Sequence, residues 1–113
     1  MAAKAWLTQF LLDCCPSPSN GLTFCSGSLG ASADNDLVKI IEDFGDKIHF
    51  IHLRNVVRGS DGSFYEAEHL GGSVRMEKVM KSTIKEQKKR HEKSGIVSIP
   101  MRPDHGHVLL DDK

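Results

Sequence analysis

The chain has 113 residues, enough for one domain with a modest core, and its 15 basic and 15 acidic side chains give a formal net charge of 0. This balance produces no overall field that would attract nucleic acid, an anionic membrane surface or an acidic partner. The cysteine count is 3, with Cys14 and Cys15 adjacent, which is not typical of a disulfide framework and indicates a reducing compartment.

The first predicted element is a helix that ends before Pro16. Its apolar residues recur at helical spacing: Trp6, Leu7, Phe10 and Leu11. The apolar stretch from Ala5 to Cys15 is too short to span a bilayer, and it lacks the basic start and cleavage site of a secretory signal. We therefore expect a cytoplasmic protein with no membrane partner.

A short strand, Leu22 to Phe24, follows the first helix and leads to Cys25. The small residues from Cys25 to Gly30 predict a loop. Asp34 or Asn35 is the expected N-cap of a second helix. The apolar face of this helix comprises Leu37, Ile40, Ile41 and Phe44, and Gly45 ends it.

The run from Ile48 to Leu53 is apolar and β-branched, which indicates a buried strand. Its two histidines, His49 and His52, are three positions apart and therefore point to opposite faces. His52 lies nearer the end of the strand and is the candidate ligand, whereas His49 is assigned a structural role. The alternative for His52 is a hydrogen-bonded core histidine.

The segment from Arg54 to Gly72 is polar and predicts a long loop. Ser73 is the expected cap of a third helix that ends at Gly95, with its apolar residues facing inward: Met76, Val79, Met80 and Ile84. The basic residues near the end of this helix are interrupted by glutamates and suit a helix C-terminus better than nucleic acid. The last predicted strand runs from Ile96 to Met101.

Helices and strands therefore alternate along the chain, which predicts an α/β fold with about three parallel strands joined by crossover helices. Ligands of such sheets bind at the carboxyl ends of the strands. Cys25, His52 and Asp104 each lie at or just beyond the end of a different strand, so they are the candidate metal ligands. The alternatives are a buried cysteine and an ordinary turn at Asp104.

Asp104 is followed by His105, an order that suits a metal ligand beside an acid–base group. Within the polar loop, Glu66, Glu68 and His69 are placed to line the same rim, the alternative being a solvated loop.

Four segments in this order resemble the mannonate dehydratase family. They are Ser17 to Ser28, Ile48 to Asn55, Phe64 to Leu70 and Ile99 to His107. The resemblance extends from about Leu11 to the end of the chain. It implies a TIM-type barrel that dehydrates D-mannonate to 2-dehydro-3-deoxy-D-gluconate, a step of hexuronate breakdown.

The family's metal is manganese or ferrous iron, held by one cysteine, two histidines and an aspartate. The resemblance assigns three of these ligands to Cys25, His52 and Asp104, and it assigns proton transfer to His105. A divalent ion would act as a Lewis acid on the oxygens of the sugar acid. A thiolate donor suits ferrous iron or zinc at least as well as manganese.

The predicted substrate-binding residues surround these ligands. Arg54 and Arg102 are suited to pair with the carboxylate of D-mannonate. Asn55 and His69 complete the predicted set.

A complete barrel of this type needs about 250 residues, so we expect residues 1–113 to form a single partial barrel, truncated at both ends. The family's other histidine ligand and a proposed catalytic tyrosine lie outside the matching segments. Exposed strand edges would favour self-association, which predicts a homo-oligomer. The alternative functions are a non-catalytic remnant of the enzyme, or another metal-dependent sugar barrel such as an isomerase.

Overall fold

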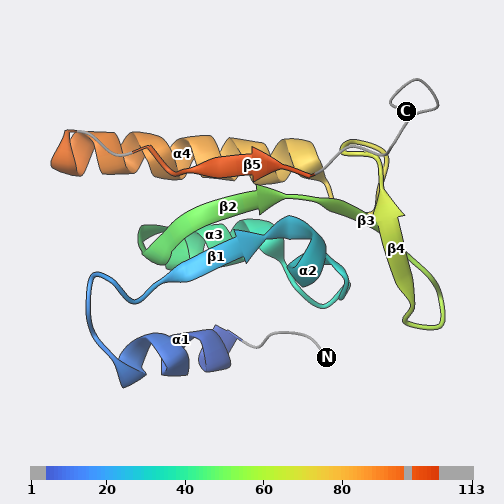
Figure 1. Ribbon diagram of the computed structural model, residues 1–113, viewed down its shortest axis with the longest axis horizontal. Coiled ribbons are helices and arrows are strands. Elements are labelled where there is room, and N and C mark those ends of the chain that lie inside the picture. Colours follow the sequence, from blue (N-terminus) through green and yellow to red (C-terminus); the bar gives the residue numbers. More distant parts are fainter. Residues whose placement is uncertain (1–4, 96–97, 105–113) are drawn as a thin grey trace, which may run out of the picture.

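A parallel sheet of three strands forms the centre of the computed structural model, which describes residues 5–95 and 98–104 (Figure 1). Strand β2 (Ile48–Leu53) lies between β1 (Leu22–Cys25) and β5 (Met101–Pro103), and both neighbours run parallel to it. The predicted α/β class and parallel strands are therefore confirmed. In the described part of the chain, these three strands form an open sheet rather than a closed barrel.

The first helix, α1 (Ala5–Cys14), is confirmed, and it ends before the prolines that follow it. Its apolar residues are mostly exposed, since Trp6, Phe10 and Leu11 keep 68%, 58% and 56% of their surface accessible. Leu12 is the buried residue of this helix.

The small-residue segment after β1 is the short helix α2 (Ser26–Gly30), which corrects the predicted loop. Cys25 is its N-cap, because the Cys25 Sγ accepts a hydrogen bond from the Ser28 N–H at 3.4 Å. A cysteine at this position is a weak capping signal, which explains why the sequence did not reveal the helix.

Helix α3 (Leu37–Phe44) covers one face of the sheet and buries Leu37, Ile41 and Phe44. Its N-cap is Asp36, whose Oδ1 accepts from the Lys39 N–H at 3.0 Å, so the predicted cap at Asp34 or Asn35 is wrong. The Asn35 amide instead donates to the carbonyl oxygen of Leu29. The turn η1 (Gly45–Lys47) then leads into β2.

The segment from Arg54 to Gly72 contains an antiparallel hairpin, which corrects the predicted loop. Strands β3 (Asn55–Arg58) and β4 (Phe64–Ala67) project beyond the carboxyl end of β2 (Figure 1). The sequence feature that indicates this hairpin is a pair of adjacent apolar residues on each side of the Asp61-Gly62 turn. Gly62 has a φ of +87°, which a glycine adopts without steric strain.

Helix α4 (Met76–Ser94) also covers this face of the sheet, and Gly95, with a φ of +81°, ends it as predicted. The predicted cap is wrong, because the Ser73 Oγ accepts from the Arg58 N–H and Arg75 precedes the helix without a capping side chain. Met80 and Ile84 are 42% and 54% exposed rather than buried. The buried side of α4 instead comprises Met76, Val79, Ser82 and Glu86.

The last strand is later in the chain than predicted, since β5 begins at Met101 rather than Ile96. Residues 96–97 lie outside the described residues. Ile99 is buried, and its N–H donates to the Gln87 Oε1 at 3.3 Å. Because β5 ends at Pro103, Asp104 follows directly at the carboxyl end of the sheet.

Candidate metal and substrate site

Strand register brings the predicted site residues side by side. Cys25 on β1 pairs with His52 on β2, and His52 pairs with Arg102 on β5. Directly paired residues of neighbouring strands point to the same face of a sheet. The opposite face carries Ile51 and Leu53, which are buried in the core. The candidate site therefore lies on the sheet face that α3 and α4 do not cover (Figure 1).

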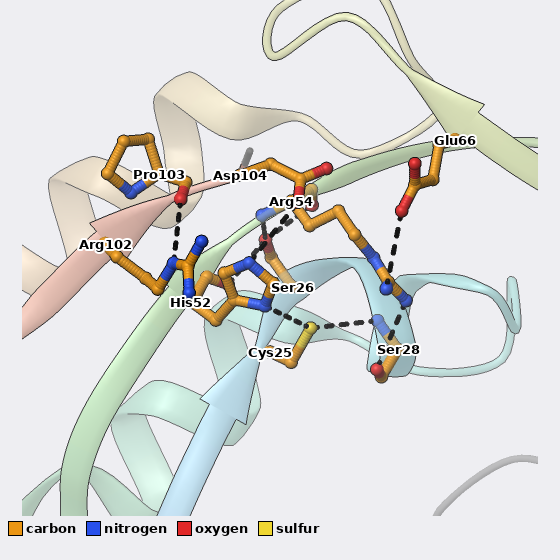
Figure 2. Close-up of polar contacts among 9 residues, drawn as sticks. All are labelled: Cys25, Ser26, Ser28, His52, Arg54, Glu66, Arg102, Pro103 and Asp104. Atoms are coloured by element: carbon orange, nitrogen blue, oxygen red, sulfur yellow. Dashed lines mark hydrogen bonds and ion pairs between the residues drawn. The ribbon is translucent and has the colours of Figure 1, made fainter. Parts of the chain in front are cut away.

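Cys25, His52 and Asp104 form a connected row (Figure 2). The Cys25 Sγ lies 3.4 Å from the His52 Nδ1, and the His52 Nε2 lies 3.4 Å from the Asp104 Oδ1. The Asp104 N–H donates to the Leu53 carbonyl oxygen at 3.0 Å, which fixes Asp104 to the end of β2. The side chains of His52 and Asp104 are only 22% and 8% exposed.

The donor types in this row are those that bind divalent transition metals, namely thiolate, imidazole and carboxylate. The His52 Nε2 is buried and makes no hydrogen bond to any described residue, although it lies within ion-pair distance of Asp104. A buried nitrogen without a hydrogen bond is costly, and a metal ion would satisfy it. In donor type and in this unsatisfied nitrogen, the residues fit such an ion.

The placement of the donors is less favourable to a single ion. Cys25 and Asp104 face different nitrogens of the His52 ring, and one ion binds only one of the two. Accordingly, within residues 5–95 and 98–104, no three His, Cys, Asp or Glu side chains are grouped so that they could hold one ion.

Ser26 holds the ends of β1 and β2 together and was not identified from the sequence. Its Oγ accepts from the Arg54 N–H at 2.9 Å, donates to the Arg54 carbonyl oxygen at 2.7 Å and lies 3.3 Å from the His52 carbonyl oxygen. The side chain is fully buried. The only sequence feature that pointed to this role of Ser26 was its place beside a candidate ligand at the end of a strand.

Arg54 follows β2 and lies at the same rim as Cys25 (Figure 2). Its Nη1 lies 3.8 Å from the Glu66 Oε1, and its Nη2 donates to the Ser28 Oγ at 3.3 Å. The Arg54 Nε is buried and has no hydrogen-bond partner among the described residues. The Nε packs against Gly27, and the terminal nitrogens of the guanidinium lie at the edge of the site.

The other predicted substrate-binding residues differ in their surroundings. Asn55 is fully buried, and its amide forms hydrogen bonds to the backbone of three residues: Val56, His69 and Val74. These bonds use both donors and two acceptor positions, so Asn55 holds the hairpin in place. His69 is exposed and contributes its carbonyl oxygen to this network.

Arg102 is exposed, and its Nε lies 3.5 Å from the Pro103 carbonyl oxygen. His105, the predicted proton-transfer residue, lies outside the described residues.

Comparison with known proteins assigns the family. The sequence model of D-mannonate dehydratase (UxuA) matches residues 3–113. The chain belongs to the D-mannonate dehydratase family. This confirms the resemblance and places the chain in a family of carbon–oxygen lyases.

Two similar proteins are mannonate dehydratases. The protein from Saccharophagus degradans is 53% identical over 103 residues, which cover 90% of this chain and 26% of that protein. The one from Marinomonas sp. is 50% identical over 105 residues, covering 92% of this chain and 27% of the relative. This chain therefore spans about a quarter of the length of the curated relatives it matches.

A solved structure shows the same arrangement of elements. The crystal structure of mannonate dehydratase from Streptococcus suis serotype 2 superimposes with a TM-score of 0.72 at 28% sequence identity. The match covers 94% of this chain and 29% of that one. No helix among the described residues has the length and apolar character needed to cross a membrane.

Proposed function

We propose that residues 1–113 form part of a mannonate dehydratase barrel, in which β1, β2 and β5 are adjacent barrel strands and their carboxyl ends form part of the active-site rim. The observation that carries this proposal is the row of Cys25, His52 and Asp104, joined by two contacts of 3.4 Å at the ends of three neighbouring parallel strands. Active sites of (β/α) barrels lie at this end of the strands.

The proposed cofactor is Mn2+ or Fe2+, with Cys25, His52 and Asp104 as the residues of this chain that would hold it. Such an ion, when bound, supplies Lewis acidity to the carboxylate and hydroxyl oxygens of a sugar acid. Cys25 and Asp104 face different ring nitrogens of His52, so binding of one shared ion would require these side chains to change rotamer.

The proposed reaction converts D-mannonate to 2-dehydro-3-deoxy-D-gluconate. A proton leaves the carbon next to the carboxylate, the neighbouring hydroxyl departs as water, and the resulting enol becomes the ketone. Arg54 and Arg102 are cations at the rim that would pair with the substrate carboxylate. An imidazole titrates near neutral pH, which supports His105 as the proton-transfer group.

The test combines metal retention with product formation. The purified chain is loaded with Mn2+ or Fe2+ under anaerobic conditions, desalted and analysed for bound metal, and then supplied with D-mannonate. We expect retained metal, at least a 100-fold weaker affinity in Cys25→Ser, and formation of the 2-keto product. Cys14→Ser is the matched control, because Cys14 is an exposed thiol on α1.

Failure to retain metal, together with the absence of product at every protein concentration, would contradict the proposal. Metal and D-mannonate binding without turnover would instead identify a non-catalytic member of the family. Activity on an aldose but not on D-mannonate would identify an isomerase.

We further propose that the chain acts as a homo-oligomer in the cytoplasm. Support comes from its exposed large apolar side chains, which include Trp6, Phe10 and Leu11 on α1. Analytical ultracentrifugation over a range of concentrations tests this association, and a monomer at all concentrations would contradict it.

A further inference from the structure

Three residues from two different elements surround the side chain of Arg54. Gly27 and Ser28 belong to α2, which follows β1, whereas Glu66 belongs to β4 of the hairpin. The Arg54 Nη2 donates to the Ser28 Oγ at 3.3 Å, and the Glu66 Oε1 lies 3.8 Å from the Arg54 Nη1 (Figure 2). A flexible arginine held from two sides in this way has lost much of its rotamer freedom before any ligand binds.

Gly27 provides the surface on which Arg54 lies. A Cβ at position 27 would approach the Arg54 Nε to 2.3 Å and its Cβ and Cγ to 2.9 Å. The backbone of Gly27 does not have a positive φ, so the glycine is required for space rather than for conformation. Any side chain at this position would therefore displace Arg54 from the rim.

The hairpin that carries Glu66 is itself held in place. Glu66 pairs with Val56 in the β3–β4 ladder, next to Asn55. The buried amide of Asn55 joins β3 to the backbone of His69 and Val74 on the far side of the hairpin. The position of Glu66 next to Arg54 is therefore fixed by a hydrogen-bonded hairpin rather than by a mobile loop.

We propose that Glu66 and Ser28 are positioning residues, which hold the guanidinium of Arg54 as a receptor for the carboxylate of an acidic sugar. Gly27 is the residue that makes this placement sterically possible. The consequence is selectivity for a sugar acid over the corresponding neutral sugar. This inference rests on the proposed function, since it concerns how the same site recognises the acid group.

A guanidinium held in a fixed position recognises a carboxylate for reasons of geometry and charge. A guanidinium recognises a carboxylate through paired N–H groups, which requires the plane of the group to be fixed. Prior fixing lowers the entropic cost of binding. The Arg54 Nε is buried against Gly27, so the N–H groups of Nη1 and Nη2 are the ones that a carboxylate would meet. Glu66 contacts it at ion-pair rather than hydrogen-bond distance, and its side chain is 39% exposed.

The experiment follows the Arg54 Nε–Hε signal of the 15N-labelled chain by nuclear magnetic resonance, with diamagnetic Zn2+ in place of Mn2+ or Fe2+ to keep the signal sharp and with Arg54→Lys to assign it. D-mannonate is titrated in one series and neutral D-mannose in the other. We expect D-mannonate to shift the signal with saturation and D-mannose to leave it unchanged. A parent chain that binds no D-mannonate would overturn the proposed function, and this inference with it.

Variants test the positioning role separately. In Glu66→Ala, we expect D-mannonate to bind about threefold to fivefold more weakly, the range of an exposed ion pair, with partial recovery in Glu66→Gln. D-mannose binding should not change. Glu68→Ala is the matched control, because Glu68 is an exposed carboxylate two residues further along the chain. Ser28→Ala should act in the same direction as Glu66→Ala.

Gly27→Ala should weaken D-mannonate binding on the order of 100-fold, because small displacements of a positioning group are that costly. Gly71→Ala is its control, since a Cβ at Gly71 meets its nearest atoms at an ordinary 3.6 Å. If Gly27→Ala does not fold, the Glu66 and Ser28 variants decide the question.

Two outcomes overturn the positioning role while leaving the proposed function intact. Tighter D-mannonate binding in Glu66→Ala would show that Glu66 competes with the substrate for Arg54. Unchanged binding in both Glu66→Ala and Ser28→Ala would show that the contacts are only surface interactions.

Discussion

The two ends of β2 are built on opposite principles. At the amino end, the buried Glu86 of α4 pairs with Arg90, whose Nε lies 3.3 Å from the Glu86 Oε1. The Arg90 Nη2 donates to the carbonyl oxygens of Gly45 and Ile48, the latter at 2.6 Å. A buried carboxylate and a nearly buried guanidinium are thereby neutralised and hydrogen-bonded, as buried charges require.

At the carboxyl end, buried polar atoms are left without hydrogen bonds. The His52 Nε2 and the Arg54 Nε are both buried and lack a hydrogen-bond partner among the described residues. Each such atom is destabilising by about 1–3 kcal/mol when nothing binds it.

This contrast separates a structural end of the sheet from a binding end. Charged groups that join elements are saturated by the protein itself. Polar groups at the binding end are held in position, but the protein does not supply all of their hydrogen bonds, which is typical of functional sites. Substitutions at the two ends should therefore affect different properties, and four of them are ordered below by their expected effect on the free energy of unfolding.

Glu86→Ala should have the largest effect and lower the free energy of unfolding by about 3 kcal/mol, because Arg90 would remain in place without its partner. Urea denaturation followed by circular dichroism measures the change. Glu92→Ala, an exposed position on the same helix, serves as the control. Metal affinity of the folded fraction should not change, and a loss of it would contradict the separation of the two ends.

Ser26→Ala should lower the free energy of unfolding by about 1–2 kcal/mol, because the partly buried backbone of Arg54 loses its hydrogen bonds to the Oγ. This substitution should also weaken metal binding, since Ser26 fixes the strand ends that carry Cys25 and His52. Denaturation and metal titration of the same sample measure both effects. Normal metal binding in Ser26→Ala would show that the ends are held by the strand ladder alone.

His52→Phe should change the free energy of unfolding by less than about 1 kcal/mol, because the gain from removing the unsatisfied Nε2 is offset by the loss of the Nδ1 contact with Cys25. Metal affinity should nevertheless fall at least about 100-fold through loss of a ligand. Thermal denaturation without metal and equilibrium dialysis with Mn2+ provide the two measurements. A large destabilisation of the metal-free chain would instead support a structural histidine.

Asp61→Asn should have the smallest effect. Hydrogen bonds from the side chain and backbone of Ser63 lower the pKa of the exposed Asp61 carboxyl below its ordinary value of 3.8. The stabilisation is therefore present above pH 3.8 and is lost as the pH falls through the lowered pKa of the folded state. Amide signals of Ser63 followed from pH 6 to 2 should show this titration in the parent chain and not in Asp61→Asn.

The sequence alone was sufficient to predict the three parallel strands and helices α1, α3 and α4, because apolar periodicity is a local property. It did not reveal the short helix α2 or the β3–β4 hairpin. It was also sufficient to place Cys25, His52 and Asp104 together, because residues at the ends of parallel strands share one rim, whereas their role as metal ligands stays a prediction. The contact of these three at the rim was therefore foreseeable, although their arrangement around the His52 ring was not.

The tertiary structure decided which polar residues are structural and which are available for binding. Asn55 was predicted to contact the substrate, yet backbone groups up to 19 residues away in sequence use its amide. The glutamates among the basic residues of α4 were interpreted only as part of a helix C-terminus, yet one of them, Glu86, is buried against Gly45. Hydrogen bonds between distant segments leave no periodic pattern in the sequence. For the same reason, only the folded chain could show that Gly27, Ser28 and Glu66 meet at Arg54.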